Sequence, residues 1–137
     1  MEMNEVVVLD TNALIRLFKG TARDLERALM GCARLVVPLA VCGEFLTGLE
    51  HGVGTAAERA LFDELVAMPN TAIHRPSGKT AQYYAKILNQ LRKQGTPIPT
   101  NDIWIAAETM ELGGTLYSYD RQFGAIPLLD WVLCSEA

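Results

Sequence analysis

The segment Val6–Leu9 is an uninterrupted apolar run, and three polar residues, Asp10, Thr11 and Asn12, follow it directly. A short run rich in β-branched residues, without polar alternation, is typical of a strand that is buried on both faces. Such strands belong to parallel sheets, because the helical connections between parallel strands cover both faces of the sheet. This feature therefore predicts an α/β protein with polar side chains at the end of its first buried strand.

The rest of the chain alternates short apolar segments with helical patterns. The other predicted strands comprise residues 34–37, 71–74, 115–118 and 128–133. One predicted helix begins after Pro38, and another covers residues 101–112 and ends at Gly113. This alternation predicts a three-layer α/β/α fold with a mostly parallel central sheet. Since no linker, repeat or low-complexity tract interrupts the pattern, we expect residues 1–137 to form a single domain.

Composition narrows the range of functions. The formal net charge is −4, whereas passive nucleic-acid-binding modules are usually basic. The acidic balance is still compatible with a metallonuclease, because bound cations reverse the local electrostatic field. His51 and His74 match no zinc-ligand spacing, and the three cysteines suit a reducing compartment. Without a signal peptide or a long apolar run, we expect a soluble, cytoplasmic protein that does not associate with membranes.

Four acids stand in or beside apolar runs, at points where strands end or helices begin: Asp10, Glu44, Asp102 and Asp120. An ionised acid in apolar surroundings costs several kcal/mol unless another group compensates its charge. In parallel sheets, ligands bind beyond the carboxyl ends of the strands, so we expect these acids to meet there. Oxygen ligands without clustered His or Cys favour Mg²⁺ or Mn²⁺ over zinc. The sequence therefore predicts a divalent-cation site.

Each acid also has an ordinary structural interpretation. Asp10 could simply cap the helix that follows it, since aspartate is a preferred N-cap residue. Glu44 could be a solvated helix glutamate, and Asp102 could be an N-cap, although two polar residues precede it. Asp120 could be a turn residue, because Asp-Arg after a strand is common in turns.

Taken together, four segments resemble the PIN-domain nucleases, and in particular the VapC-type toxins of toxin–antitoxin pairs. They are VVVLDTNALI, the helix that carries Glu44, TNDIWIAA and TLYSYDRQF. The resemblance covers nearly the whole chain and implies a PIN-like fold. It also implies that the four acids hold Mg²⁺ or Mn²⁺ and are catalytic. The same resemblance gives supporting roles to four polar residues, namely Thr11, Asn12, Asn101 and Ser118.

The resemblance further implies an endoribonuclease that hydrolyses phosphodiester bonds and acts as the toxin of a type II pair. Its substrate would be a structured RNA, such as a transfer or ribosomal RNA. Its partners would be a cognate antitoxin protein and a second copy of the chain, as a homodimer. The alternative is a non-catalytic PIN-fold scaffold that binds RNA or protein. Metal-dependent RNA cleavage distinguishes the two, because a scaffold would leave RNA uncut.

Overall fold

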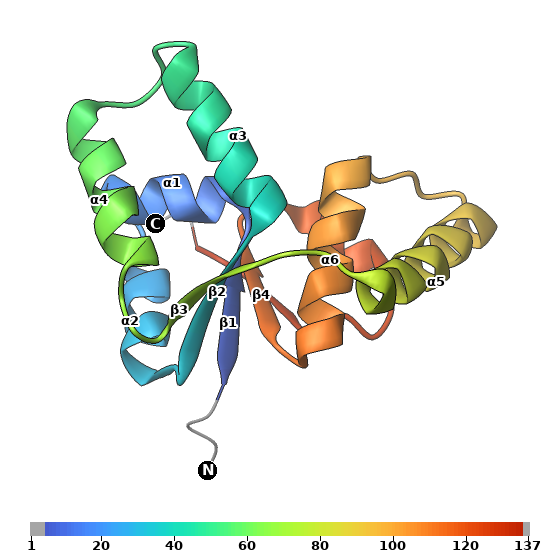
Figure 1. Ribbon diagram of the computed structural model, residues 1–137. Coiled ribbons are helices and arrows are strands. Elements are labelled where there is room, and N and C mark those ends of the chain that lie inside the picture. The colour runs from blue at the N-terminus through green and yellow to red at the C-terminus, as the bar shows by residue number, and fades with distance from the viewer. Residues whose placement is uncertain (1–4, 136–137) are drawn as a thin grey trace.

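The computed structural model describes residues 5–135 and contains a five-stranded sheet at its centre (Figure 1). The strand order is β3-β2-β1-β4-β5, and all four neighbouring pairs are parallel. The strands are β1 (Val6–Leu9), β2 (Arg34–Pro38), β3 (Thr71–His74), β4 (Thr115–Ser118) and β5 (Trp131–Leu133). The predicted α/β fold is confirmed, with a sheet that is entirely parallel within the described residues.

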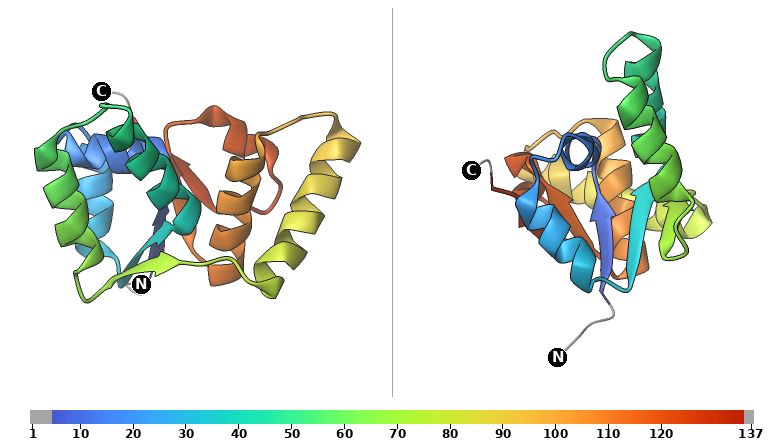
Figure 2. Two further views of the ribbon diagram at one scale, coloured as in Figure 1. Left: turned by 45° about the horizontal axis from the view of Figure 1, so that its top comes forward. Right: turned by 90° about the vertical axis from the view of Figure 1, so that its left-hand side faces the viewer.

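Helices cover both faces of this sheet. Figure 2 shows α2 and α4 on one side and α5 and α6 on the other, so the predicted layers are present. The helices are α1 (Thr11–Phe18), α2 (Arg23–Gly31), α3 (Leu39–Glu50), α4 (Ala56–Val66), α5 (Gly78–Gln94) and α6 (Thr100–Leu112), with a 3₁₀ helix, η1 (Arg121–Ala125). Within residues 5–135, none of these helices combines the length and apolar character needed to cross a bilayer.

The central strand β1 forms the middle of the hydrophobic core. Val7, Val8 and Leu9 are completely buried, as the apolar run predicts for a strand covered on both faces. β1 pairs with β2 on one side and with β4 on the other, and Leu9 lies opposite Tyr117. This register brings the residue after β1 next to the last residue of β4, Ser118.

The last strand is shorter than the sequence predicts. It covers Trp131–Leu133 rather than residues 128–133. Leu128 has a positive φ of 67° and an exposed side chain, so the backbone turns there instead of extending. A left-handed backbone conformation is uncommon for a non-glycine residue, and the apolar composition of the segment does not reveal it.

Candidate active site

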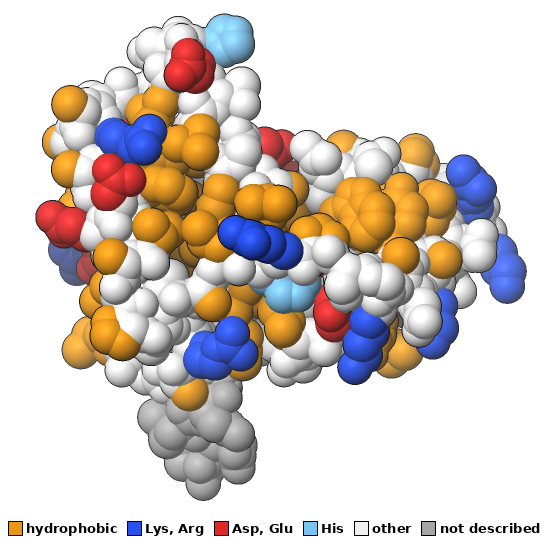
Figure 3. Space-filling model, in the orientation of Figure 1, with side chains coloured by type: hydrophobic (Ala, Val, Ile, Leu, Met, Phe, Trp, Pro, Cys, Tyr) orange, Lys and Arg blue, Asp and Glu red, His pale blue; other side chains and the backbone are white. Residues whose placement is uncertain are grey.

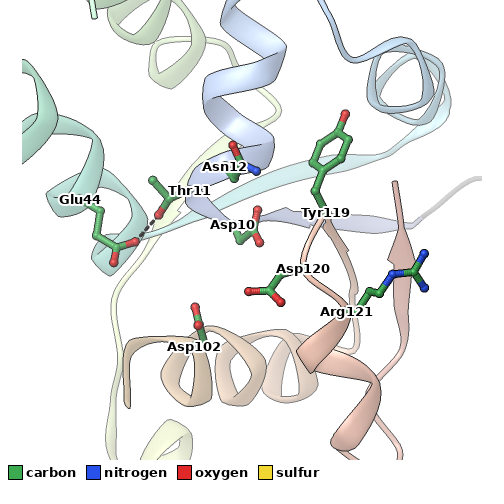
Figure 4. Close-up of a pocket in the computed structure, with 8 residues that line it drawn as sticks. All are labelled: Asp10, Thr11, Asn12, Glu44, Asp102, Tyr119, Asp120 and Arg121. Carbon is green, nitrogen blue, oxygen red and sulfur yellow. Dashed lines mark hydrogen bonds between the residues drawn. The ribbon is translucent and has the colours of Figure 1, made fainter. Parts of the chain in front are cut away.

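The carboxyl ends of the central strands open into a cleft of about 570 Å³. Its lining comes from the β1–α1 junction, α3, α6 and the segment after β4, which are distant in sequence (Figure 4). The lining residues are Asp10, Thr11, Asn12, Glu44, Asp102, Tyr119, Asp120 and Arg121. All four predicted acids therefore line one cleft, at the edge of the sheet where parallel strands expose ligand sites.

Asp10 is fixed by hydrogen bonds to both of its carboxylate oxygens. It is the N-cap of α1, where Oδ1 accepts from the backbone N–H of Ala13 at 2.9 Å. Oδ2 accepts from the hydroxyl of Ser118, 2.5 Å away at the end of β4. The capping interpretation of Asp10 is thus confirmed, but it is incomplete. The same buried carboxylate, only 6% exposed, also lines the cleft.

Glu44 approaches the cleft from α3, which begins directly after β2 with Pro38 as its N-cap. Its side chain is exposed, as the solvated-helix interpretation predicts. However, the carboxylate accepts hydrogen bonds from the hydroxyl of Thr11 and, at 3.2 Å, from Nδ2 of Asn101. Two of the predicted supporting residues therefore hold Glu44 at the mouth of the cleft, and Figure 4 shows the bond from Thr11.

Asp102 lies in the first turn of α6 and does not cap this helix. The N-cap is Pro99, which has no side-chain cap, so the alternative interpretation of Asp102 as an N-cap is wrong, and the polar residues before it do not cap the helix either. Proline is well suited to the start of a helix because it lacks the N–H that would otherwise be unsatisfied. The half-buried Asp102 side chain instead accepts a hydrogen bond from Nε2 of Gln122 at 2.6 Å.

Asp120 caps the 3₁₀ helix η1, and Oδ1 accepts from the backbone N–H of Gln122 at 3.0 Å. Its own backbone N–H donates to the hydroxyl of Ser118 at 2.9 Å. The turn interpretation therefore describes the local structure correctly. The second carboxylate oxygen accepts from Nε2 of Gln122 at 2.8 Å, and the exposed side chain lines the cleft beside Asp102.

A family model for the PIN domain matches residues 7–128, which includes all of these side chains. The chain belongs to the PIN domain family. Among curated proteins it is similar to "Ribonuclease VapC1" from Haemophilus influenzae strain R2866. The two are 30% identical over 130 residues, which cover 92% of this chain and 96% of the relative.

Solved structures with the same fold include the VapBC-1 structure from nontypeable Haemophilus influenzae. The match has a TM-score of 0.75 at 26% identity and covers 93% of this chain and 96% of the other. The crystal structure of VapBC2 from Rickettsia felis, bound to a promoter DNA fragment, matches with a TM-score of 0.81 at 20% identity. That match covers 95% of this chain and 99% of the other, and it bears on the fold alone.

Burial raises the pKa values of two acids in the PIN-domain cleft, Asp10 and Asp102. Burial raises the pKa of Asp10, although the hydrogen bonds from Ser118 and Ala13 oppose the rise. Burial also raises the pKa of Asp102 to about 6, against the hydrogen bond from Gln122. The nearby charges of Asp120 and Glu44 raise both pKa values further. Negative charges that lie close together in a partly buried site repel one another, and a nearby positive charge would stabilise their ionised forms.

The chemistry of this PIN-domain cleft fits a hard dication, because the four acids that line it offer oxygen atoms as donors. Within residues 5–135, however, no three acidic, histidine or cysteine side chains already stand close enough to share an ion. A cation shared by three of these acids would therefore require side-chain rotation. Glu44 is exposed at the mouth of the cleft, whereas Asp10 is buried and fixed.

Sequence reasoning missed the role of Gln122, which contacts both Asp102 and Asp120. The residue lies within the recognised TLYSYDRQF segment, but its spacing to Asp120 alone does not reveal a contact with α6. Tyr119 also lines the cleft, with the guanidinium of Arg16 4.2 Å from its ring centroid. Arg121 lines the cleft too, yet its guanidinium points away from the carboxylates (Figure 4).

Proposed function

We propose that this chain is a metal-dependent endoribonuclease, the toxin of a type II toxin–antitoxin pair, with residues 1–137 forming one nuclease domain. Its catalytic and metal-binding residues are Asp10, Glu44, Asp102 and Asp120. The observation that carries the proposal is the convergence of these carboxylates, from four separate parts of the chain, on one cleft. Curated relatives that are 29% and 30% identical to this chain are named "Ribonuclease VapC1", which supports the proposed cleavage of RNA.

Mg²⁺ or Mn²⁺ is the cofactor that this oxygen-only ligand set favours. A bound dication supplies Lewis-acid chemistry, since it activates water and offsets the charge that develops on a phosphodiester during hydrolysis. The residues of the chain position the acids. Ser118 and the backbone of Ala13 fix Asp10 by hydrogen bonds. Thr11 and Asn101 hold Glu44 in the same way. In the metal-free state, the four acids would repel the phosphates of RNA. Binding of the substrate therefore depends on the cation as much as the reaction does.

The substrate class in this proposal is structured RNA, such as transfer or ribosomal RNA, cleaved in the cytoplasm. Hydrolysis by an activated water does not use the 2′-hydroxyl, so the products carry 5′-phosphate and 3′-hydroxyl ends. A cyclic phosphate at the 3′ end would contradict this mechanism. Sequencing of RNA ends after expression of the protein identifies both the cleaved RNA and its end chemistry.

A cognate antitoxin and a second copy of the chain are the proposed protein partners. Several matching structures are of VapBC assemblies, which supports the antitoxin. Figure 3 shows apolar side chains gathered over the α3–α4 region and over α5 and α6, which supports association through these surfaces. Leu39, Leu61 and Ile73 are among the exposed large apolar side chains. Light scattering of the purified protein measures whether a dimer forms.

The decisive experiment is cleavage of total RNA by the purified protein with Mg²⁺, with Mn²⁺ and with EDTA. We expect cleavage with either metal and none with EDTA. Asp10→Asn should abolish cleavage but leave the fold intact, because asparagine is an equally good N-cap. Undiminished cleavage by a rigorously purified Asp10→Asn protein would refute the assignment. A scaffold, in contrast, would bind RNA equally with and without metal and cleave none.

A further inference from the structure

Gln122 joins two of the proposed metal-binding acids through a single amide group. Its Nε2 lies 2.6 Å from Oδ2 of Asp102 and 2.8 Å from Oδ2 of Asp120. An amide nitrogen carries two hydrogens, so both of its donors are engaged. The bridge spans two elements, the first turn of α6 and the segment that begins η1.

The backbone of Gln122 is anchored at the same place. Its N–H donates to Oδ1 of Asp120 at 3.0 Å, so one residue contacts both oxygens of this carboxylate. The charge of Asp120 raises the pKa of Asp102, which means that the two acids repel each other when both are ionised. Asp120 is also exposed and would otherwise be able to rotate away. The amide therefore opposes the separation that repulsion favours.

We propose that Gln122 is a positioning residue that holds Asp102 and Asp120 at the spacing needed to bind one divalent cation together. This inference rests on the proposed function, because it assumes that both acids bind the metal. A carboxylate offers about four lone-pair positions, so donation from Gln122 leaves others for an ion. Hydrogen bonds of this kind, which orient metal ligands, typically change metal affinity 10–100-fold when removed.

The opposite possibility is that the amide merely takes the place of the cation in the metal-free protein. In that case the metal would have to displace it, and removal of the amide would strengthen metal binding. The direction of the change in affinity therefore decides between positioning and competition.

Titration of the protein with Mn²⁺, followed by electron paramagnetic resonance, tests the inference without measuring RNA cleavage. Gln122→Met keeps the length of the side chain and removes both donors. We expect about 10–100-fold weaker Mn²⁺ binding, with a melting temperature in EDTA close to that of the wild type. Gln90→Met is the matched control, because it removes an exposed amide that donates to Gln94, outside the cleft. Its Mn²⁺ affinity should not change.

Gln122→Asn provides a second variant in case the methionine disturbs the fold. It keeps an amide and the backbone bond, but it is too short to reach both carboxylates, so weaker Mn²⁺ binding is again expected. Wild-type or stronger binding by either folded variant would overturn the inference. If Asp10→Asn also binds Mn²⁺ as the wild type does, the proposed metal centre itself fails. If only Asp10→Asn loses binding, the role of Gln122 fails and the proposed function stands.

Discussion

The two ends of α6 hold acidic side chains in opposite ways. Asp102, in the first turn, faces the cleft, and its neighbours there include three other carboxylates. Glu108, almost two turns later, is fully buried and lies 2.6 Å from Nδ1 of His74, the last residue of β3. One helix therefore carries an acid that faces other acids and an acid that faces a basic partner.

The buried end is largely satisfied by the protein itself. His74 contacts Glu108 and, through Nε2 at 3.5 Å, Glu111, which also accepts from the hydroxyl of Thr80 at 2.5 Å. Burial raises the pKa of Glu108, and the hydrogen bond from His74 opposes the rise. Oε2 of Glu108 has no hydrogen-bond partner among the described residues. We interpret this group as a structural link between β3, α5 and α6.

The cleft acids differ, because the described groups that donate hydrogen bonds to them are neutral. Their donors are hydroxyl, amide and backbone N–H groups, and no Lys, Arg or His within residues 5–135 forms an ion pair with any of them. The comparison teaches that clustering of acids does not by itself indicate a metal site. The cluster that lacks an ion-paired basic side chain among the described residues is the one expected to bind a cation from solution.

The largest expected effect is on stability, at the buried end. His74→Ala removes the donor to a fully buried carboxylate and should lower the free energy of unfolding by about 3 kcal/mol. Cleavage by the remaining folded protein should not change. Urea unfolding measures the loss, and His51→Ala is the control, because that ring is exposed and hydrogen-bonds to the backbone carbonyl of Thr47 in α3. If the His74→Ala protein is as stable as this control, the contact between His74 and Glu108 does not stabilise the buried part of α6.

A smaller loss of stability is expected where the cleft reaches into the core. Ser118→Ala removes the hydroxyl that donates to the buried Asp10 and should cost about 2 kcal/mol, as for hydrogen bonds to charged groups. Thr47→Ala is the matched control, because its exposed hydroxyl bonds only to a carbonyl within α3. It should change the free energy of unfolding by about 0.5 kcal/mol or less. Equal losses in the two variants would show that the bond to Asp10 is unimportant for stability.

At the mouth of the cleft, the effect should appear in catalysis rather than in stability. Glu44→Gln removes one negative charge but keeps an acceptor oxygen for one of its two donors, Thr11 or Asn101. We expect RNA cleavage at limiting Mn²⁺ to fall about tenfold or more, about 1.4 kcal/mol, with an unchanged melting temperature. Glu50→Gln, also exposed on α3, is the control. If both variants cleave equally well, Glu44 is not a ligand.

The smallest effect is a dependence of stability on pH. Because the pKa of Asp102 is about 6 in the folded protein, above its ordinary 3.8, its contribution to stability is present at low pH. That contribution is lost as the pH rises through about 6. In EDTA, the melting temperature of the wild type should therefore fall over this range, and Asp102→Asn should flatten the fall. Mn²⁺ affinity should rise over the same range, since the metal binds the ionised acid.

Much of the fold follows from the sequence. The predicted limits of the first strand and of segments 71–74 and 115–118 match the structure. For the first strand the reason is clear, because an apolar β-branched run without polar alternation fits a strand buried in a parallel sheet. The start of the last strand could not be predicted, since it depends on the left-handed backbone at Leu128.

The acids of the site could be located because strand ends define the binding edge of a parallel sheet. Their hydrogen-bond partners could not. Gln122 and Asp102 are 20 residues apart and meet only through the packing of η1 beside α6. His74, which matches no metal spacing in the sequence, gains its role from Glu108, 34 residues away. Such contacts depend on how side chains from different helices and strands point toward each other. Local sequence patterns do not contain this information.

The bond between Ser118 and Asp10 joins residues 108 positions apart, across the pairing of β1 with β4. During translation, the first of the four acids leaves the ribosome long before the strand that completes its surroundings. A nascent chain that stops before β4 lacks both this hydroxyl and Asp120, so its cleft is incomplete. If the four acids form the RNA-cutting centre as proposed, that centre can be completed only after β4 and Asp120 have been synthesised, which delays the hazard of this nuclease to the cell.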